Sequence, residues 1–243
     1  MQKYKYRNAS LFIAIILIIR WLIQQFRDII TTRAILKDVT QLSFLKTYFH
    51  GFDTFSPIGF CTFDALLFMF MFVYIQRYVR STEIIRIQKR EKILFEHTKD
   101  ILIISLIYTF VSYIIHFCGV LILFDSQYIR ESHMILYGLI NLPVIYLFLI
   151  KTGLLQYLFS SFIGRKVSAF VVFTIYILEA LFFAPKFKWL PFMDSSIYPK
   201  LLAEEISKSQ IINTYIRLIA FIVALYVINL IVNSRKDYLK DEK

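Results

Sequence analysis

Residues 101–124 read ILIISLIYTFVSYIIHFCGVLILF, and this stretch decides the class of protein. It contains no lysine, arginine, aspartate or glutamate. A helix that crosses the hydrocarbon core of a bilayer, about 30 Å thick, needs roughly 20 consecutive apolar residues. The stretch is longer than that, so we expect a transmembrane helix over residues 101–124.

The rest of the chain shares this apolar character. Of its 243 residues, 58% are hydrophobic and 19% are charged, and the mean hydropathy is +0.62. Soluble domains are typically about 45–50% apolar and about 25% charged. One soluble core cannot bury such an excess, so the composition indicates a protein whose solvent is largely lipid.

Five further stretches are apolar enough to cross a bilayer. The six predicted spans are 9–26, 57–75, 101–124, 133–150, 167–185 and 211–232. No repeat or low-complexity linker divides them. We therefore expect an all-α polytopic membrane protein that forms a single transmembrane domain over residues 1–243. Six spans place both termini on the same side of the membrane.

The positions of the basic residues predict which side that is. Cytoplasmic segments of membrane proteins are enriched in lysine and arginine. Most of the 28 lysines and arginines lie in one alternating set of segments, which comprises 1–8, 76–100, 151–166 and 233–243. We therefore expect these segments and both termini to be cytoplasmic. Residues 27–56, 125–132 and 185–210 are then outside.

Two of the outer segments carry structural signals. Residues 27–56 begin with RDIITTRAILKDVTQLSFLKTYFH, in which apolar and charged residues mix as in an amphipathic helix at a membrane interface. Residues 185–210 contain prolines, which break helices, together with interfacial aromatic residues. We expect short broken helices that cap the outer end of the bundle.

Residues 80–100, RSTEIIRIQKREKILFEHTKD, form a dense basic stretch between two apolar spans. Its apolar side chains recur at roughly the spacing of one helix face. One predicted face holds Ile84, Ile87, Leu94 and Phe95, and the other holds Arg86, Lys89, Arg90 and Lys92. Two interpretations stay open: a segment held against anionic lipid, or a cytoplasmic helix that docks a soluble partner. Nucleic acid is not expected, because no groove-reading fold surrounds the stretch.

The chain resembles the permease subunit of a type-2 ABC exporter, of the small kind associated with bacteriocin or peptide export and immunity. The second predicted span ends YIQRYVR and leads through the basic stretch directly into the third. A proline-rich segment separates the fifth and sixth spans, and the sixth closes as VINLIVNSRKDYLK, an apolar helix with a basic tail. The likeness covers the whole chain at the level of topology.

This resemblance implies a mechanism. A separate ABC ATPase subunit would bind ATP and push on a docking helix, and two permease copies or homologues would move a hydrophobic or amphipathic peptide across a bacterial plasma membrane. The chain has no GxxxxGK[ST] P-loop, so we expect neither catalysis nor a bound cofactor in this subunit. In this family the docking helix can precede the first span. Only eight residues do so here, which assigns docking to residues 82–96.

Five ionisable residues fall inside predicted spans, where charge is costly. They are Arg20, Asp64, His116, Glu179 and Arg217. Their depths, at about 1.5 Å of rise per residue, place all five in the outer half of the bilayer. Neighbouring spans suggest two ion pairs, Arg20 with Asp64 and Glu179 with Arg217, because an unpaired charge costs at least about 2.5–3.5 kcal/mol.

Two roles for these charges stay open. In one interpretation the pairs only lock helices together, and in the other they line a polar outer vestibule that releases the substrate. The vestibule hypothesis predicts that Asp64→Asn or Glu179→Gln inserts normally but loses transport. Pro143, in GLINLPVIY, removes a helical hydrogen bond and is expected to kink its span, as a static kink or as a hinge. Cys61 and Cys118 lack metal-ligand spacing, so neither a metal site nor a disulfide is expected.

Two other classes of function compete with export. Glu204 and Glu205 begin like the EExxxR box of CAAX-type intramembrane proteases, but Ser209 stands where arginine is needed, and no HExxH or GxSxG occurs. A stand-alone immunity or sensor protein would bind a peptide without transporting it and would need the same helical bundle. A long cytoplasmic helix that binds an ATPase would favour the exporter.

Overall fold

The computed structural model describes residues 6, 8, 10–20, 22–23, 59–75, 90–123, 126–180, 194–202 and 205–235. These residues are almost all helical, and no strand occurs among them, as predicted for an all-α protein. In chain order the elements are a first helix Ser10–Arg20, η1 (Phe60–Asp64), α4 (Ala65–Ile75), α6 (Arg90–Leu123), α7 (Ser126–Glu131), α8 (Met134–Ile163), α9 (Arg165–Leu178), α10 (Tyr198–Leu202) and α11 (Lys208–Arg235).

Three helices are long and apolar enough to cross a membrane. They are Lys92–Cys118 within α6, Met134–Ile163 and Lys208–Arg235, and they fall on the third, fourth and sixth predicted spans. Shorter apolar helices, Ser10–Arg20 and Phe60–Ile75, fall on the first two. The 14-residue helix α9 falls on the fifth.

The predicted boundary between the fourth and fifth spans is wrong. The sequence placed a connecting segment at residues 151–166, but α8 continues to Ile163 and α9 begins at Arg165. Gly164 alone makes the turn, with a φ of 83° that favours glycine. The prediction stopped at Lys151 because a cation after an apolar run resembles a membrane boundary. In the structure this lysine is inside the bundle, 2% exposed.

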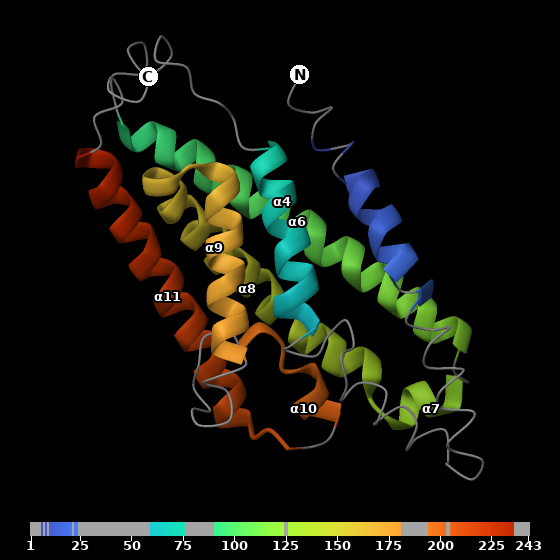
Figure 1. Cartoon of the computed structure of the whole chain (residues 1–243). Helices are drawn as coiled ribbons and strands as arrows, with labels where there is room; N and C mark the ends of the chain where they lie inside the picture. Colours follow the sequence, from blue (N-terminus) through green and yellow to red (C-terminus); the bar gives the residue numbers. More distant parts are fainter. Residues whose placement is uncertain are drawn as a thin grey trace.

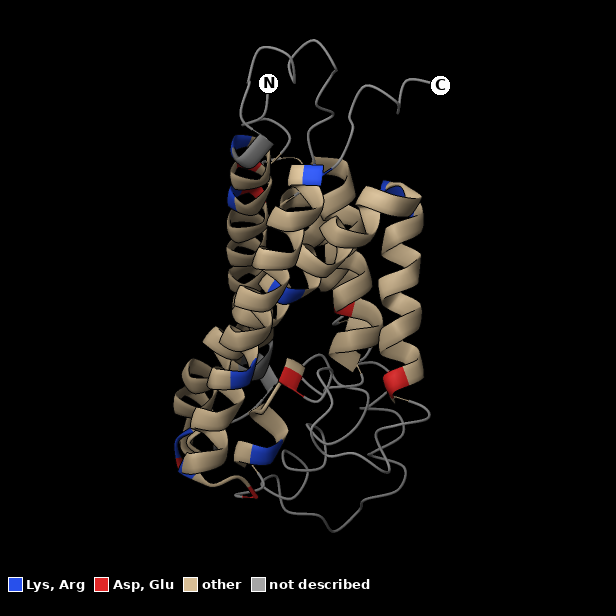
Figure 2. Cartoon of the chain, turned by 90° about the vertical axis from the view of Figure 1, so that its left-hand side faces the viewer, with Lys and Arg blue, Asp and Glu red and all other residues tan. Residues whose placement is uncertain are grey.

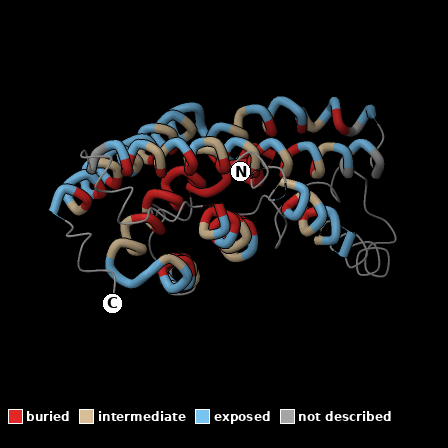
Figure 3. The backbone as a smooth tube through the Cα atoms, turned by 90° about the horizontal axis from the view of Figure 1, so that it is seen from above, coloured by how far each residue is buried: buried red, intermediate tan, exposed pale blue. Residues whose placement is uncertain are grey.

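Helix α8 is the centre of the bundle. It packs against α4, α6, α7, α9, α10 and α11 (Figure 1). Its residues 148–154 are all buried, although they cover every side of the helix. A helix that is buried all round must have neighbours on every side. The other helices turn their buried faces inward and their exposed faces outward (Figure 3).

Two glycines let α6 approach α8 closely. A Cβ atom added at Gly153 would lie 2.7 Å from Cγ2 of Ile101, and one at Gly138 would lie 2.2 Å from the ring of Phe117. Close helix packing in lipid depends on such small residues, because lipid offers no hydrophobic driving force between helices. The two glycines therefore set the separation of α6 and α8.

Helix α11 is attached to α8 by polar contacts. Nδ2 of Asn229 donates to the carbonyl oxygen of Leu154 at 3.1 Å, and the hydroxyl of Tyr157 donates to Oδ1 of Asn233 at 3.2 Å. Both asparagines belong to the closing motif VINLIVNSRKDYLK and are buried. They thus hold the last helix to the central one.

The two ends of the bundle can be told apart in Figure 1. Helices α7 and α10 lie at one end, which we call the α10 end. The turn between α8 and α9, the start of α6 and the finish of α11 lie at the opposite end, which we call the α8–α9 end. Between the ends, charged positions interrupt the helices only rarely (Figure 2).

We predict that Gly153→Leu loosens the contact between α6 and α8. Overpacking a filled interior typically costs about 1–3 kcal/mol. The variant should therefore show a lower midpoint of thermal unfolding in detergent, followed by intrinsic fluorescence. Ala220→Leu, on an exposed position of α11, is the matched control and should unfold like the native chain. Equal midpoints for all three proteins would contradict the packing described here.

Candidate functional site

A group of polar side chains is buried in the middle of the bundle, where several helices meet. We call it the polar core, and its members are Arg20, Cys61, Asp64, Tyr108, Lys151, Tyr176, Glu179, Asp194 and Ser195. Asp64, Lys151 and Asp194 are at most 4% exposed. Ionisable residues inside membrane helices are rare and commonly mark a functional site. The polar core is therefore the candidate site.

Asp64 is the centre of one half of the polar core. The guanidinium of Arg20 forms an ion pair with Oδ2 of Asp64, and the hydroxyl of Tyr108 donates to Oδ1 at 2.9 Å. The predicted pair of Arg20 and Asp64 is thus present in the structure. Asp64 ends η1, a π-helical turn of the kind often found at functional sites. Its carboxylate links the first helix, η1 and α6.

Lys151 is the centre of the other half, and sequence reasoning missed it. Its Nζ lies 4.2 Å from the ring centroid of Phe148 and 5.3 Å from that of Tyr176, which is a cation–π arrangement. Cys61, Glu179 and Asp194 act on it electrostatically. The apolar residues that follow it, TGLLQYLFSSFI, were the signal that the helix continues.

The predicted pair of Glu179 and Arg217 is wrong. Arg217 instead pairs with Asp194, through Nε to Oδ2 at 2.9 Å and Nη2 to Oδ1 at 2.6 Å. The reason is that residues 194–202 fold back into the bundle and bring Asp194 to α11. Glu179, directly after α9, acts on Lys151 and Cys61. The prediction considered only charges within neighbouring spans, whereas Asp194 comes from the segment that connects α9 and α11.

His116 lies beside α10. It is 3% exposed on α6, and its ring centroid lies 6.1 Å from that of Tyr198 and 5.7 Å from that of Phe117. The sequence grouped His116 with the four intramembrane charges. The structure places it against the segment that contains Asp194, at the border of the polar core.

Asn141 binds the same segment from α8. Its Nδ2 donates to the hydroxyl of Tyr113 at 2.8 Å, and its Oδ1 accepts from the backbone N–H of Ile197 at 2.8 Å. The side chain of Asn141 is fully buried. Pro143, two residues later, lies inside α8, which continues as helix on both sides of it. The hinge at Pro143 stays a prediction.

Part of the predicted docking segment is visible as the start of α6. Ile84, Arg86, Ile87 and Lys89 lie outside the described residues, and Arg90 is the first residue of α6. Leu94 is 1% exposed and Phe95 is 60% exposed. The prediction that these two share one face is wrong, because the inward face of α6 already packs on the bundle. The exposed face carries Lys92, Phe95 and Lys99.

The remaining sequence predictions are met only in part. Residues 27–56 lie outside the described residues, and of 185–210 the structure describes 194–202 and 205–210. The five-residue helix α10 agrees with the expected short helices. Cys61 is buried and Cys118 is exposed, and the two cysteines form no disulfide. Among the described residues no group of three or more His, Cys, Asp or Glu side chains could hold a metal ion.

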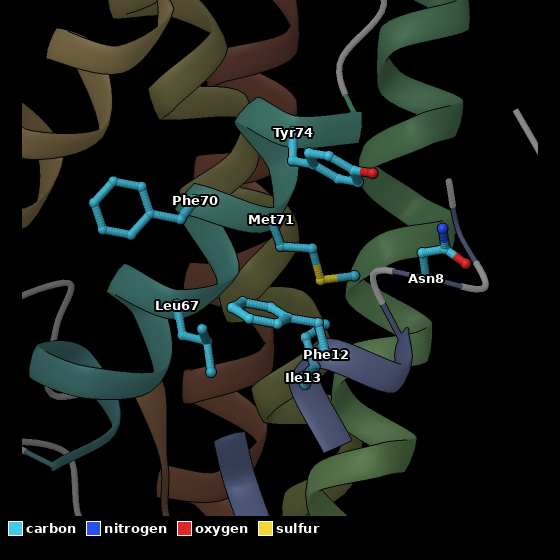
Figure 4. Close-up of a pocket in the computed structure, with 7 residues that line it drawn as sticks. All are labelled: Asn8, Phe12, Ile13, Leu67, Phe70, Met71 and Tyr74. Atoms are coloured by element: carbon cyan, nitrogen blue, oxygen red, sulfur yellow. The ribbon is translucent and has the colours of Figure 1, made fainter. Parts of the chain in front are cut away.

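A separate apolar cavity of about 410 Å³ lies between the first helix and α4 (Figure 4). Its lining residues are Asn8, Phe12, Ile13, Leu67, Phe70, Met71 and Tyr74. Phe12 and Tyr74 are exposed at its rim. None of its described lining residues belongs to the polar core.

Comparison with known proteins identifies no relative. No family model matches the chain, and neither a curated protein nor a solved structure matches it.

We predict that the ion pair of Arg20 and Asp64 stabilises the bundle. Asp64→Asn leaves the Arg20 charge buried without its carboxylate, and breaking one partner of a buried pair typically costs about 3–5 kcal/mol. The double variant Arg20→Met/Asp64→Asn removes both charges and should unfold at a higher temperature than the single variant. Glu131→Gln, on an exposed position, is the control. A single variant as stable as the native chain would contradict a structural role for the pair.

Proposed function

We propose that this chain is the membrane-spanning permease subunit of an ATP-driven exporter. It would cross a bacterial plasma membrane six times with both termini in the cytoplasm. With a separate ABC ATPase, and as a dimer with a second permease, it would move a hydrophobic or amphipathic peptide out of the cell. The observation that carries the proposal is the continuity of α6 between the basic segment and the polar core.

Helix α6 is longer than a bilayer core is thick. Its 34 residues extend for about 51 Å at 1.5 Å of rise per residue, against about 30 Å of hydrocarbon. The exposed residues Lys92, Phe95 and Lys99 lie in its first turns, at the α8–α9 end. That end is the cytoplasmic one in the proposed topology.

The same helix carries Tyr108, which donates to Asp64 in the polar core. No break separates Arg90 from Tyr108. A push on the exposed start of α6 would therefore reach Asp64 through one continuous helix. The hydroxyl of Tyr6, next to the first helix, also donates a hydrogen bond to Asp100 of α6. The first helix would therefore move together with α6. This is the mechanical connection that an ATP-driven permease needs.

The charge distribution supports the proposed orientation. Lys151 lies inside the bundle, so it is not counted among the cytoplasmic lysines and arginines. Without it, that set still holds most of the 28 lysines and arginines. In the proposed topology the excess of lysine and arginine thus falls in the cytoplasmic segments, as expected for a cytoplasmic face.

A peptide-binding immunity or sensor protein is the second candidate. The observation that favours it is the cavity between the first helix and α4, which opens laterally and is lined by aromatic and aliphatic side chains (Figure 4). Such a cavity suits one apolar segment of a membrane-active peptide. This candidate requires no ATPase, and that difference separates the two functions by experiment.

We predict that the native chain co-purifies with an ABC ATPase through the exposed face of α6. Tagged protein would be isolated from its own host in mild detergent, and its partners identified by mass spectrometry. The variant Lys92→Glu/Phe95→Asp/Lys99→Glu reverses charge and removes the apolar contact on that face only, so it should lose the ATPase while retaining its membrane level. Leu94 is left unchanged because it is buried.

The matched control is Arg130→Glu, an exposed charge reversal at the α10 end, which should keep the ATPase. If no ATPase co-purifies with the native chain, the permease proposal is wrong and the peptide-binding protein is favoured. An ATPase that stays bound to the triple variant would move docking away from the start of α6.

A further inference from the structure

Residues 194–202 form a buried segment at the α10 end, which we call the strap. Residues 194–199 are all buried, and Ser195 and Ser196 are completely so. Residues 196 and 197 are not helical. Non-helical backbone within a membrane domain is tolerated only where protein covers it and supplies its hydrogen bonds. The strap satisfies this requirement through contacts with three helices.

The first contact is with α8. Oδ1 of Asn141 accepts the backbone N–H of Ile197 at 2.8 Å and the hydroxyl of Ser196 at 3.4 Å. The hydroxyl of Tyr198 donates to the carbonyl oxygen of Met134 at 3.4 Å. The amide of Asn141 thus replaces the partner that a helix would have given the backbone. These bonds join neutral groups.

The second contact is with α11, where Arg217 holds Asp194 by two hydrogen bonds. The side chain of Arg217 is 39% exposed, whereas that of Asp194 is 6% exposed. An ion pair with one exposed partner stabilises less than a fully buried one, because water can solvate the arginine once the pair opens. Opening of this pair, which we call the latch, would therefore leave the arginine solvated, whereas Arg20 and Asp64 are both nearly buried.

The third contact is with η1, beneath the strap. The side chain of Ser195 hydrogen-bonds the thiol of Cys61, which is 0% exposed. Cys61 and Asp194 both act electrostatically on Lys151. The strap therefore contributes Asp194 and Ser195 to the polar core and contacts its other members Cys61 and Lys151.

We propose that the strap is a gate that closes the polar core at the α10 end and opens when the Arg217–Asp194 latch is released. The inference rests on the proposed function, in which the α10 end is the outer end, and it adds the element that controls release there. In the closed state seen here, Ser195 hydrogen-bonds Cys61, which is fully buried. In the open state Cys61 is accessible from the α10 end.

Cys61 is its own reporter for the test. In the Cys118→Ser chain, purified in detergent, the rate of modification by a small maleimide is measured by mass spectrometry. The latch variant Arg217→Gln should raise the rate for Cys61 at least about tenfold, because local opening becomes more frequent. The charge-swapped variant Asp194→Arg/Arg217→Asp should return it toward the native rate.

Two controls separate opening of the strap from general loosening. Arg130→Gln makes the same change at the same end without touching the strap and should leave Cys61 protected. A reporter is also placed at the opposite end by Ser168→Cys in a Cys61→Ser/Cys118→Ser chain, because Ser168 is fully buried. Adding Arg217→Gln should leave this reporter protected.

Protection of Cys61 in the Arg217→Gln chain would overturn the gate, and so would equal gains in reactivity at positions 61 and 168. The test needs no ATPase, so its result is independent of the co-purification experiment. If Cys61 becomes reactive in the latch variant but no ATPase co-purifies, the strap is a gate on a binding protein. If an ATPase co-purifies but Cys61 stays protected in the latch variant, the permease proposal stands and the gate proposal is wrong.

Discussion

The burial of charged side chains in an apolar bundle determines how these helices assemble. An isolated charge in hydrocarbon is costly, so each buried charge needs a partner or an aromatic surface. Asp64 pairs with Arg20 and accepts a hydrogen bond from Tyr108, both on other elements. Lys151 lies over the rings of Phe148 and Tyr176. Because these partners come from separate helices, satisfying the charges also fixes which helices meet.

The two kinds of ion pair differ in a way that matters for movement. Arg20 and Asp64 are both nearly buried, and tie the first helix to the core. Arg217 remains partly exposed, and holds only the strap through Asp194. Around them, apolar packing and the glycines of α8 keep α6, α8 and α11 together. The gate proposed for the strap therefore depends on the ion pair that keeps one partner partly exposed.

Much of the helical architecture follows from apolar length alone, which is why α6 and α11 agree with their predicted spans. The pair of Arg20 and Asp64 was also predictable, since both lie in neighbouring apolar helices. Lys151 was missed because a hydropathy pattern treats a lysine as a boundary, whereas aromatic packing buries it. Asp194 was missed because no local pattern reveals that a connecting segment re-enters the bundle.

We propose that these helices cross a membrane with the α8–α9 end in the cytoplasm. The most direct test labels single cysteines with a membrane-impermeant maleimide in intact cells, using Ser126→Cys or Ser234→Cys in a Cys61→Ser/Cys118→Ser chain. Both positions are exposed, on α7 and at the end of α11. The account predicts labelling at 126 in intact cells and at 234 only after permeabilisation. Labelling of both positions from the same side would contradict it.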